Sequence, residues 1–183
     1  MSDTALLVID AQESFRQRSN WFETDHARYL ERQQALIDGA VAAGIPVVRV
    51  LHHEPEGVFE LFSGHVRSLE ELRLTPEAEF LKTRHSALVG TGLDVWLTEH
   101  GIRRLLISGI RTEQCCETTT RHASDLGWQV DFVAEATLTT PLDYNGRTLS
   151  PAEITERTCA ALAGRFATVV TVDEALGRTR AAA

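Results

Sequence analysis

The strongest constraint on the fold is an alternation of short apolar runs with segments of helical spacing. Five runs rich in Val, Ile or Leu recur along the chain, at Ala5–Ile9, Pro46–Leu51, Leu105–Ser108, Val130–Val133 and Thr168–Val172. Short runs without polar alternation are typical of parallel strands that are buried on both faces. The sequence therefore predicts an α/β fold with a parallel sheet between helices.

The intervening segments predict helices. The segment His26–Ala43 has Ile37 and Val41 at a spacing that places both on its apolar side. A later helix begins at Ser150-Pro151-Ala152-Glu153, where a capping serine, a first-position proline and a capping-box glutamate stand in order. We expect that helix to end at Gly164.

Size and charge limit the function. A chain of 183 residues, 43% of them hydrophobic, suits one domain over residues 1–183, with a frayed tail from about 178 to 183. A net charge of −8 argues against nucleic acid or an anionic membrane as partner, because both require clustered Lys and Arg. The start has no secretory pattern and no run is long enough to span a bilayer. We therefore expect a cytoplasmic protein that binds a small molecule.

The three cysteines are predicted to be free thiols. Cys115 and Cys116 are adjacent and Cys159 stands apart, so the chain has neither a disulfide framework nor the paired spacing of a structural zinc site.

Asp10 and Lys82 each follow an apolar segment. Asp10 comes directly after Ala5–Ile9, which predicts a position at the carboxyl edge of the sheet, where open α/β folds form their ligand crevices. A residue there equally suits a turn cap. Lys82 follows Phe80–Leu81, whose periodicity only weakly indicates a strand. Such a lysine is either solvated or a cation that lowers a thiol pKa and stabilises charge during acyl transfer.

Cys115 and Cys116 lie at the start of a predicted helix that follows Gly109 and ends near Gly127. With Thr112 as its N-cap, Cys115 falls in the first turn, where free amides and the helix dipole favour a thiolate. Cys116 points about 100° away, so only one of the two thiols faces the crevice. The local pattern does not choose between them, and simple packing of both remains an alternative.

Three separated blocks carry a family resemblance. They are Leu6-Leu7-Val8-Ile9-Asp10-Ala11-Gln12 with Phe15, then Lys82-Thr83-Arg84-His85-Ser86-Ala87-Leu88, and Gly109-Ile110-Arg111-Thr112-Glu113-Gln114-Cys115 with Thr118, Arg121, Ala123 and Gly127. In this order, and nearly end to end, the chain resembles the isochorismatase-like cysteine hydrolases. That superfamily includes nicotinamidases, N-carbamoylsarcosine amidases, ureidoacrylate hydrolases and isochorismatases.

The resemblance implies a three-layer α/β sandwich whose six-stranded parallel sheet has the order 3-2-1-4-5-6, with helices on both faces. It places the family's catalytic triad on Asp10, Lys82 and Cys115, and so selects Cys115 over Cys116. It also implies a cis peptide between Ile110 and Arg111, with the amides of Arg111 and Cys115 as the oxyanion hole. Homodimers or homotetramers are common among relatives. The long side chain of Arg111 departs from the small residue usual there and faces either the pocket or a partner subunit.

The reaction that the resemblance favours is hydrolysis of a C–N bond in a small amide, carbamoyl or ureido compound through a thioester. The alternatives are vinyl ether hydrolysis of isochorismate, which needs no cysteine, and a catalytically idle binding or scaffold protein. Candidate substrate-binding residues are Gln12, Phe15, Arg16, Trp21, His53 and Arg84. Arginines near the site favour a carboxylate on the substrate, or else are surface charges. The connection His52–Pro76 is a candidate lid.

We expect neither a metal nor another cofactor. Nicotinamidase relatives hold a divalent ion with an Asp-x-His pair and a further His after the second strand, and this motif is absent here. His52 and His53 are adjacent, which is awkward for one ion, and His65 follows much later.

Overall fold

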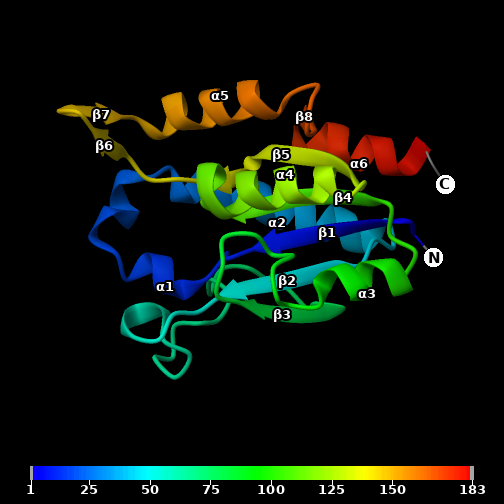
Figure 1. Cartoon of the computed structure of the whole chain (residues 1–183), viewed down its shortest axis with the longest axis horizontal. Helices are drawn as coiled ribbons and strands as arrows, with labels where there is room; N and C mark the ends of the chain where they lie inside the picture. The colour runs from blue at the N-terminus through cyan, green and yellow to red at the C-terminus, as the bar shows by residue number, and fades with distance from the viewer. Residues whose placement is uncertain (1, 182–183) are drawn as a thin grey trace.

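The protein is described by a computed structural model over residues 2–181, with one six-stranded parallel sheet at its centre (Figure 1). The strands of this sheet are β1 (Thr4–Ile9), β2 (Val47–His52), β3 (Ala78–Lys82), β4 (Arg104–Ile110), β5 (Gln129–Leu138) and β8 (Thr168–Val170). Their order is β3-β2-β1-β4-β5-β8, and every neighbouring pair is parallel. Counted within this sheet alone, the order is the predicted 3-2-1-4-5-6, so the α/β fold class is confirmed.

Helices cover both faces of the sheet, with α4 in front of it and α2 behind it in Figure 1. The helices α2 (His26–Ala42) and α6 (Val172–Ala181) pack on one face, and α3 (Leu93–Glu99), α4 (Glu117–Asp125) and α5 (Pro151–Leu162) pack on the other. Shorter pieces are α1 (Glu13–Arg16), the turns η1 (Ser19–Glu23) and η2 (Gly57–Phe59), and the π-helical turn η3 (Thr112–Cys116). None of the helices within residues 2–181 has the length and apolar character that a bilayer crossing requires.

Two cores result from the alternation of side chains along the strands. In β1, Leu6 and Val8 join the core under α2 and α6, whereas Leu7 and Ile9 join the core under α3, α4 and α5. All six residues of β1 are buried, which explains why the run shows no polar alternation.

The predicted apolar side of α2 is wrong at Val41. That side chain is 61% exposed, whereas Ile37 and Ala40 are buried against the sheet. The buried side also contains Gln33, whose amide donates a 3.1 Å hydrogen bond to the hydroxyl of Ser108 on β4. A polar side chain can lie on a buried face when it has a buried hydrogen-bond partner. A pattern of hydrophobic residues alone therefore misplaces the buried face of α2.

The last two helices refine the predicted ends. Helix α5 has the expected capping box of Ser150 and Glu153 and ends at Leu162, two residues before Gly164. Helix α6 continues to Ala181, and Arg178 donates a 2.8 Å hydrogen bond to buried Asp131, so the fraying expected from residue 178 stays a prediction. Residues 182 and 183 lie outside the described part of the chain.

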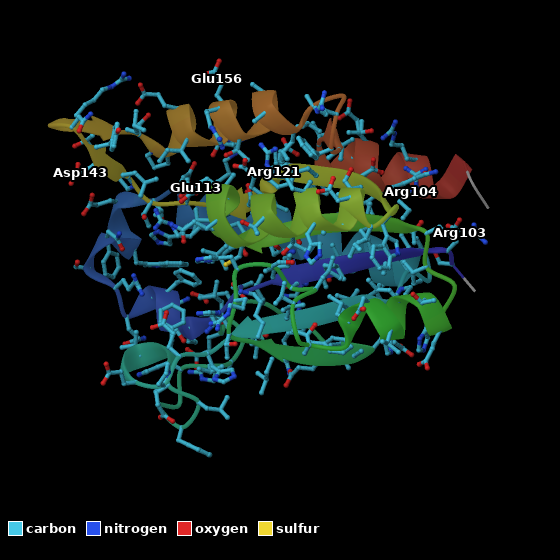
Figure 2. All side chains as sticks on the ribbon, in the orientation of Figure 1. Arg103, Arg104, Glu113, Arg121, Asp143 and Glu156 are labelled. Atoms are coloured by element: carbon cyan, nitrogen blue, oxygen red, sulfur yellow. The ribbon has the colours of Figure 1, made fainter. Side chains whose placement is uncertain are left out.

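A two-stranded hairpin was not predicted. It consists of β6 (Leu142–Tyr144) and β7 (Arg147–Leu149), and it projects beyond the sheet in Figure 1. Asp143, on β6, is labelled in Figure 2. The turn residues Asn145 and Gly146 both have positive φ, the conformation that a two-residue hairpin turn favours.

Candidate active site

Asp10 lies where β1 and β4 end side by side. Ile9 is paired with Gly109 in the sheet register, and a Cβ on Gly109 would lie 1.8 Å from the carbonyl oxygen of Ile9. Only glycine permits this approach, at a φ of +126°. Asp10 itself has a φ of 52°, in the left-handed region that aspartate tolerates better than most residues. The buried carboxylate is thereby held beside the start of the β4–α4 connection.

Lys82 is the last residue of β3 and its side chain is fully buried. Its ammonium nitrogen lies 2.7 Å from Asp10 Oδ2, and it donates to Cys115 Sγ at 3.3 Å and to the carbonyl oxygen of Arg84 at 3.1 Å. His52 Nδ1, at 3.4 Å, is a fourth polar neighbour of this ammonium group. Lys82 therefore contacts both the carboxylate of Asp10 and the sulfur of Cys115.

Cys115 lies in η3, and its residue is 6% exposed, whereas Cys116 is completely buried. Thr112 does not cap the turn as predicted. It is the first residue of η3, and its hydroxyl donates to Thr137 Oγ1 at 2.9 Å. Of the two thiols, it is Cys115 that contacts Lys82.

The electrostatics of the site differ from the prediction of a thiolate. Burial, and then the charge of Asp10, raise the pKa of Cys115 to about 12, although Lys82 opposes that shift. The expectation of a thiolate is therefore wrong here, because burial makes the largest contribution to the shift and favours the neutral thiol. Burial also raises the pKa of Asp10, against the opposing effect of Lys82. Burial lowers the pKa of Lys82, but Asp10 and Cys115 together outweigh it, so the net direction is upward. The resting site holds a thiol beside a cation.

Glu117 anchors the helix that follows the cysteine. Its buried carboxylate accepts from both the Nε and the Nη2 of Arg121 at 3.0 and 2.9 Å, from Arg157 at 2.6 Å and from the hydroxyl of Thr158 at 3.1 Å. Arg121 is labelled on α4 in Figure 2. The network ties the segment after Cys115 to α5, and so restrains the position of the thiol.

The peptide bond between Ile110 and Arg111 is cis. The Arg111 side chain, whose direction the sequence left open, turns toward Glu113, with Nε 3.3 Å from Oε1, and donates to the carbonyl oxygen of Thr140 at 3.2 Å. It lines a cavity of about 20 Å³ together with Phe15 and Trp21. Two of the predicted substrate-binding residues, Phe15 and Trp21, therefore share a cavity with Arg111 at the ends of β4 and β5.

A second and larger pocket, here called the histidine pocket, has a volume of about 550 Å³. It is lined by His52, His53, Glu54, Pro55, Thr83, Arg84 and His85. The pocket reaches the site through two rings, since His52 Nδ1 lies 3.4 Å from Lys82 Nζ and His85 Nδ1 lies 3.9 Å from Cys115 Sγ.

The histidine pocket contains two predicted residues, His53 and Arg84, and two that sequence reasoning missed. His52 is the register partner of Lys82 at the end of β2, and His85 follows Lys82 by three residues. The position of His52 beside Lys82 could therefore have been inferred from the pairing of β2 with β3. The position of His85 depends on how the chain turns after β3, which no local pattern reveals.

Gln12 and Arg16 are engaged within the protein. The Gln12 amide donates to the carbonyl oxygen of His52 at 2.9 Å and accepts from the His52 amide at 2.8 Å, so it joins the end of β1 to the end of β2. The guanidinium of Arg16 pairs with Glu13 at 3.3 Å and with Glu71. Both side chains brace the loops around the site.

The residues present do not fit the divalent-ion site of nicotinamidase relatives. The two ring nitrogens of His52 face the cation of Lys82 at 3.4 Å and the carboxylate of Glu54 at 3.4 Å. Within residues 2–181, no group of three or more His, Cys, Asp or Glu side chains is arranged to hold a metal ion.

Comparison with known proteins agrees with this fold. The sequence model of the isochorismatase domain matches residues 4–174, and the chain therefore belongs to the isochorismatase family of hydrolases. A protein of that family from Chromobacterium violaceum ATCC 12472 superposes with a TM-score of 0.89 at 26% identity, over 98% of this chain and 95% of that one.

Two curated relatives extend over most of both chains. The isochorismatase family protein YrdC of Bacillus subtilis (strain 168) is 26% identical over 174 residues, which are 93% of this chain and 92% of that protein. Nicotinamidase 3 of Arabidopsis thaliana is 27% identical over 186 residues, covering 93% of this chain and 85% of that protein.

Proposed function

We propose that this protein hydrolyses a C–N bond in a small linear amide, carbamoyl or ureido compound through a thioester on Cys115. The observation that carries the proposal is the contact of Lys82 Nζ with both Asp10 Oδ2 at 2.7 Å and Cys115 Sγ at 3.3 Å. This contact brings together a nucleophile, a base and a cation, which is the set that covalent acyl transfer requires. A relative named for an amidase activity, the nicotinamidase, supports the same reaction class.

Attack begins with a protonated thiol, because burial raises the pKa of Cys115 to about 12. Asp10 accepts the thiol proton as the sulfur forms its bond to the substrate carbonyl carbon. The raised pKa of Asp10 makes it a stronger base than an exposed carboxylate. The amides of Arg111 and Cys115 donate to the developing oxyanion.

Breakdown of the tetrahedral intermediate returns the proton. Asp10 protonates the leaving nitrogen as the C–N bond breaks, and the acyl group remains on Cys115 as a thioester that water then hydrolyses. Lys82 stays protonated, since its pKa lies above the ordinary value. Its charge offsets that of Asp10, and that of the sulfur when water hydrolyses the thioester.

A screen for ammonia release across small amides and ureido acids tests the proposal, with the Cys115→Ala variant in parallel. We expect at least one compound to release ammonia, and the variant to lose turnover by about 10³-fold or more, as removal of a nucleophile does. The matched control is Cys116→Ala, because the adjacent thiol is completely buried in the core under α3, α4 and α5, and we expect this variant to keep its turnover.

Hydrolysis that continues in Cys115→Ala would contradict the proposal. The same variant acting on isochorismate would instead indicate vinyl ether hydrolysis, which needs Asp10 but no cysteine.

A further inference from the structure

The ammonium group of Lys82 has more polar neighbours than it has N–H donors. Asp10 Oδ2 lies 2.7 Å from Nζ, and the carbonyl oxygen of Arg84 lies 3.1 Å from it. Cys115 Sγ follows at 3.3 Å and His52 Nδ1 at 3.4 Å. An ammonium group has three N–H donors, so these neighbours must share them. Asp10 and Cys115 take part in the proposed hydrolysis, whereas His52 has no part in it so far.

We propose that His52 is a positioning residue for Lys82: its Nδ1 accepts from the ammonium group and holds it between Asp10 and Cys115. This inference rests on the proposed function, because it assigns His52 a part in that reaction. The sheet brings the two residues together, since His52 ends β2 and is the register partner of Lys82 at the end of β3. Their contact therefore follows from the pairing of the two strands.

The two nitrogens of the His52 ring face groups of opposite charge. Nδ1 lies 3.4 Å from the ammonium nitrogen of Lys82, and Nε2 lies 3.4 Å from Glu54 Oε1. A neutral imidazole donates from one nitrogen and accepts at the other. An acceptor beside the cation and a donor beside the carboxylate correspond to one tautomer, which has its proton on Nε2. Glu54 therefore favours the tautomer in which Nδ1 can accept from Lys82.

The charge state of the ring suits this role. Burial, and then the charge of Lys82, lower the pKa of His52, although Asp10 and Glu54 oppose that shift. The ring is therefore neutral at neutral pH. A protonated ring would have no lone pair on Nδ1, and it would place a second cation 3.4 Å from the ammonium group.

His52 is itself held in place by its surroundings. The side-chain amide of Gln12 donates to the His52 carbonyl oxygen at 2.9 Å and accepts from the His52 amide at 2.8 Å. The ring packs edge-to-face against buried Phe59, with 5.9 Å between the ring centroids, and the side chain is 15% exposed. Functional side chains are held most precisely when packing and hydrogen bonds restrain the residues that support them. His52 meets this condition for Lys82.

Two substitutions separate the acceptor from the rest of the ring. His52→Asn places an amide oxygen close to the position of Nδ1 and keeps an acceptor for Lys82, whereas His52→Leu removes the acceptor. The substrate is the amide that releases most ammonia in the screen. In His52→Leu we expect kcat to fall by about tenfold or more, because small displacements of a catalytic group are costly, while KM stays within about threefold. His52→Asn should retain most of the kcat that the leucine variant loses.

Nitrogen NMR of isotopically labelled histidine tests the geometry without a substrate. At neutral pH we expect His52 to be neutral, with its proton on Nε2, and the loss of its signals in His52→Asn assigns them. The matched control is His100→Asn, which replaces an exposed ring stacked on Trp96 at the end of α3. This control removes a different set of signals, and we expect it to leave kcat unchanged.

Several results would overturn the assignment. A proton on Nδ1 of His52, or a charged ring at neutral pH, would exclude acceptance from Lys82. Unchanged kcat in His52→Leu, or equal loss of kcat in the leucine and asparagine variants, would show that the acceptor is not what matters. A loss confined to KM would indicate contact with the substrate instead. If the wild-type protein releases ammonia from no compound, the proposed function fails, and the NMR result still decides whether Nδ1 accepts from Lys82.

Discussion

The inner and outer sides of the site around Cys115 differ in burial and in origin. On the inner side, Asp10 follows β1 and Lys82 ends β3, and neither has exposed side-chain surface. The histidine pocket, on the outer side, is built from the residues after β2 and β3, and several of them are exposed. Burial of the inner side determines the protonation of the thiol, whereas the outer side determines what reaches it.

The difference has an energetic consequence. A buried ion pair contributes little net stability, but a buried charge that has lost its partner is strongly destabilising. Substitutions on the inner side therefore change stability and chemistry together. Substitutions on the outer side change chemistry alone.

Lys82→Met breaks the inner side and has the largest expected effect. It leaves the carboxylate of Asp10 buried without its partner, so we expect the free energy of unfolding to fall by about 3 kcal/mol and turnover to be lost. Adding Asp10→Asn removes the unpaired charge and restores most of the stability, but not the activity. Urea denaturation of both variants at pH 7 measures the two values. If Lys82→Met were as stable as the wild type, the ion pair of Asp10 and Lys82 would not be desolvated.

The raised pKa of Cys115 predicts a smaller effect that depends on pH. Between its ordinary value of 9.0 and about 12, the folded protein keeps the thiol proton that the unfolded chain has lost. The unfolded state then binds fewer protons, so stability falls as pH rises through this interval. From pH 8 to pH 10 we expect the wild type to lose about 1.4 kcal/mol more than Cys115→Ser. Equal losses would place the thiol pKa of the folded protein near its ordinary value and contradict the effect of burial.

Phe62→Ser has the smallest expected effect and tests the connection between β2 and β3. Phe62 lies between β2 and β3 and is 90% exposed. Its replacement removes little packing, so we expect a change in unfolding free energy within about 0.5 kcal/mol. Ammonia release should stay at the wild-type rate if this part of the connection does not close over the site. A large loss of turnover at unchanged stability would indicate that the connection acts as a lid, as its length first suggested.

The sheet could be predicted from the sequence because buried parallel strands leave continuous apolar runs. The run Ala5–Ile9 predicted both β1 and the edge position of Asp10. The meeting of Asp10, Lys82 and Cys115 could not be read locally, since it depends on the order of strands in the sheet. Only the family resemblance supplied that order.

Features set by tertiary environment were missed. The helix-dipole argument at Cys115 ignored burial, which dominates its pKa. The buried face of α2 was mispredicted because it contains the polar Gln33, whose hydrogen-bond partner Ser108 lies far away in the sequence. His85 was overlooked and His53 was chosen, since the turn after β3 decides which ring reaches the sulfur.

The most direct test of the account is to capture the acyl group during turnover. The amide that releases most ammonia in the screen is mixed with the wild-type protein, the mixture is quenched with acid, and the cysteine-containing peptide is analysed by mass spectrometry. The account predicts the mass of the acyl group on Cys115 and an unmodified Cys116. Unmodified Cys115 in protein that is quenched while ammonia release continues would contradict it.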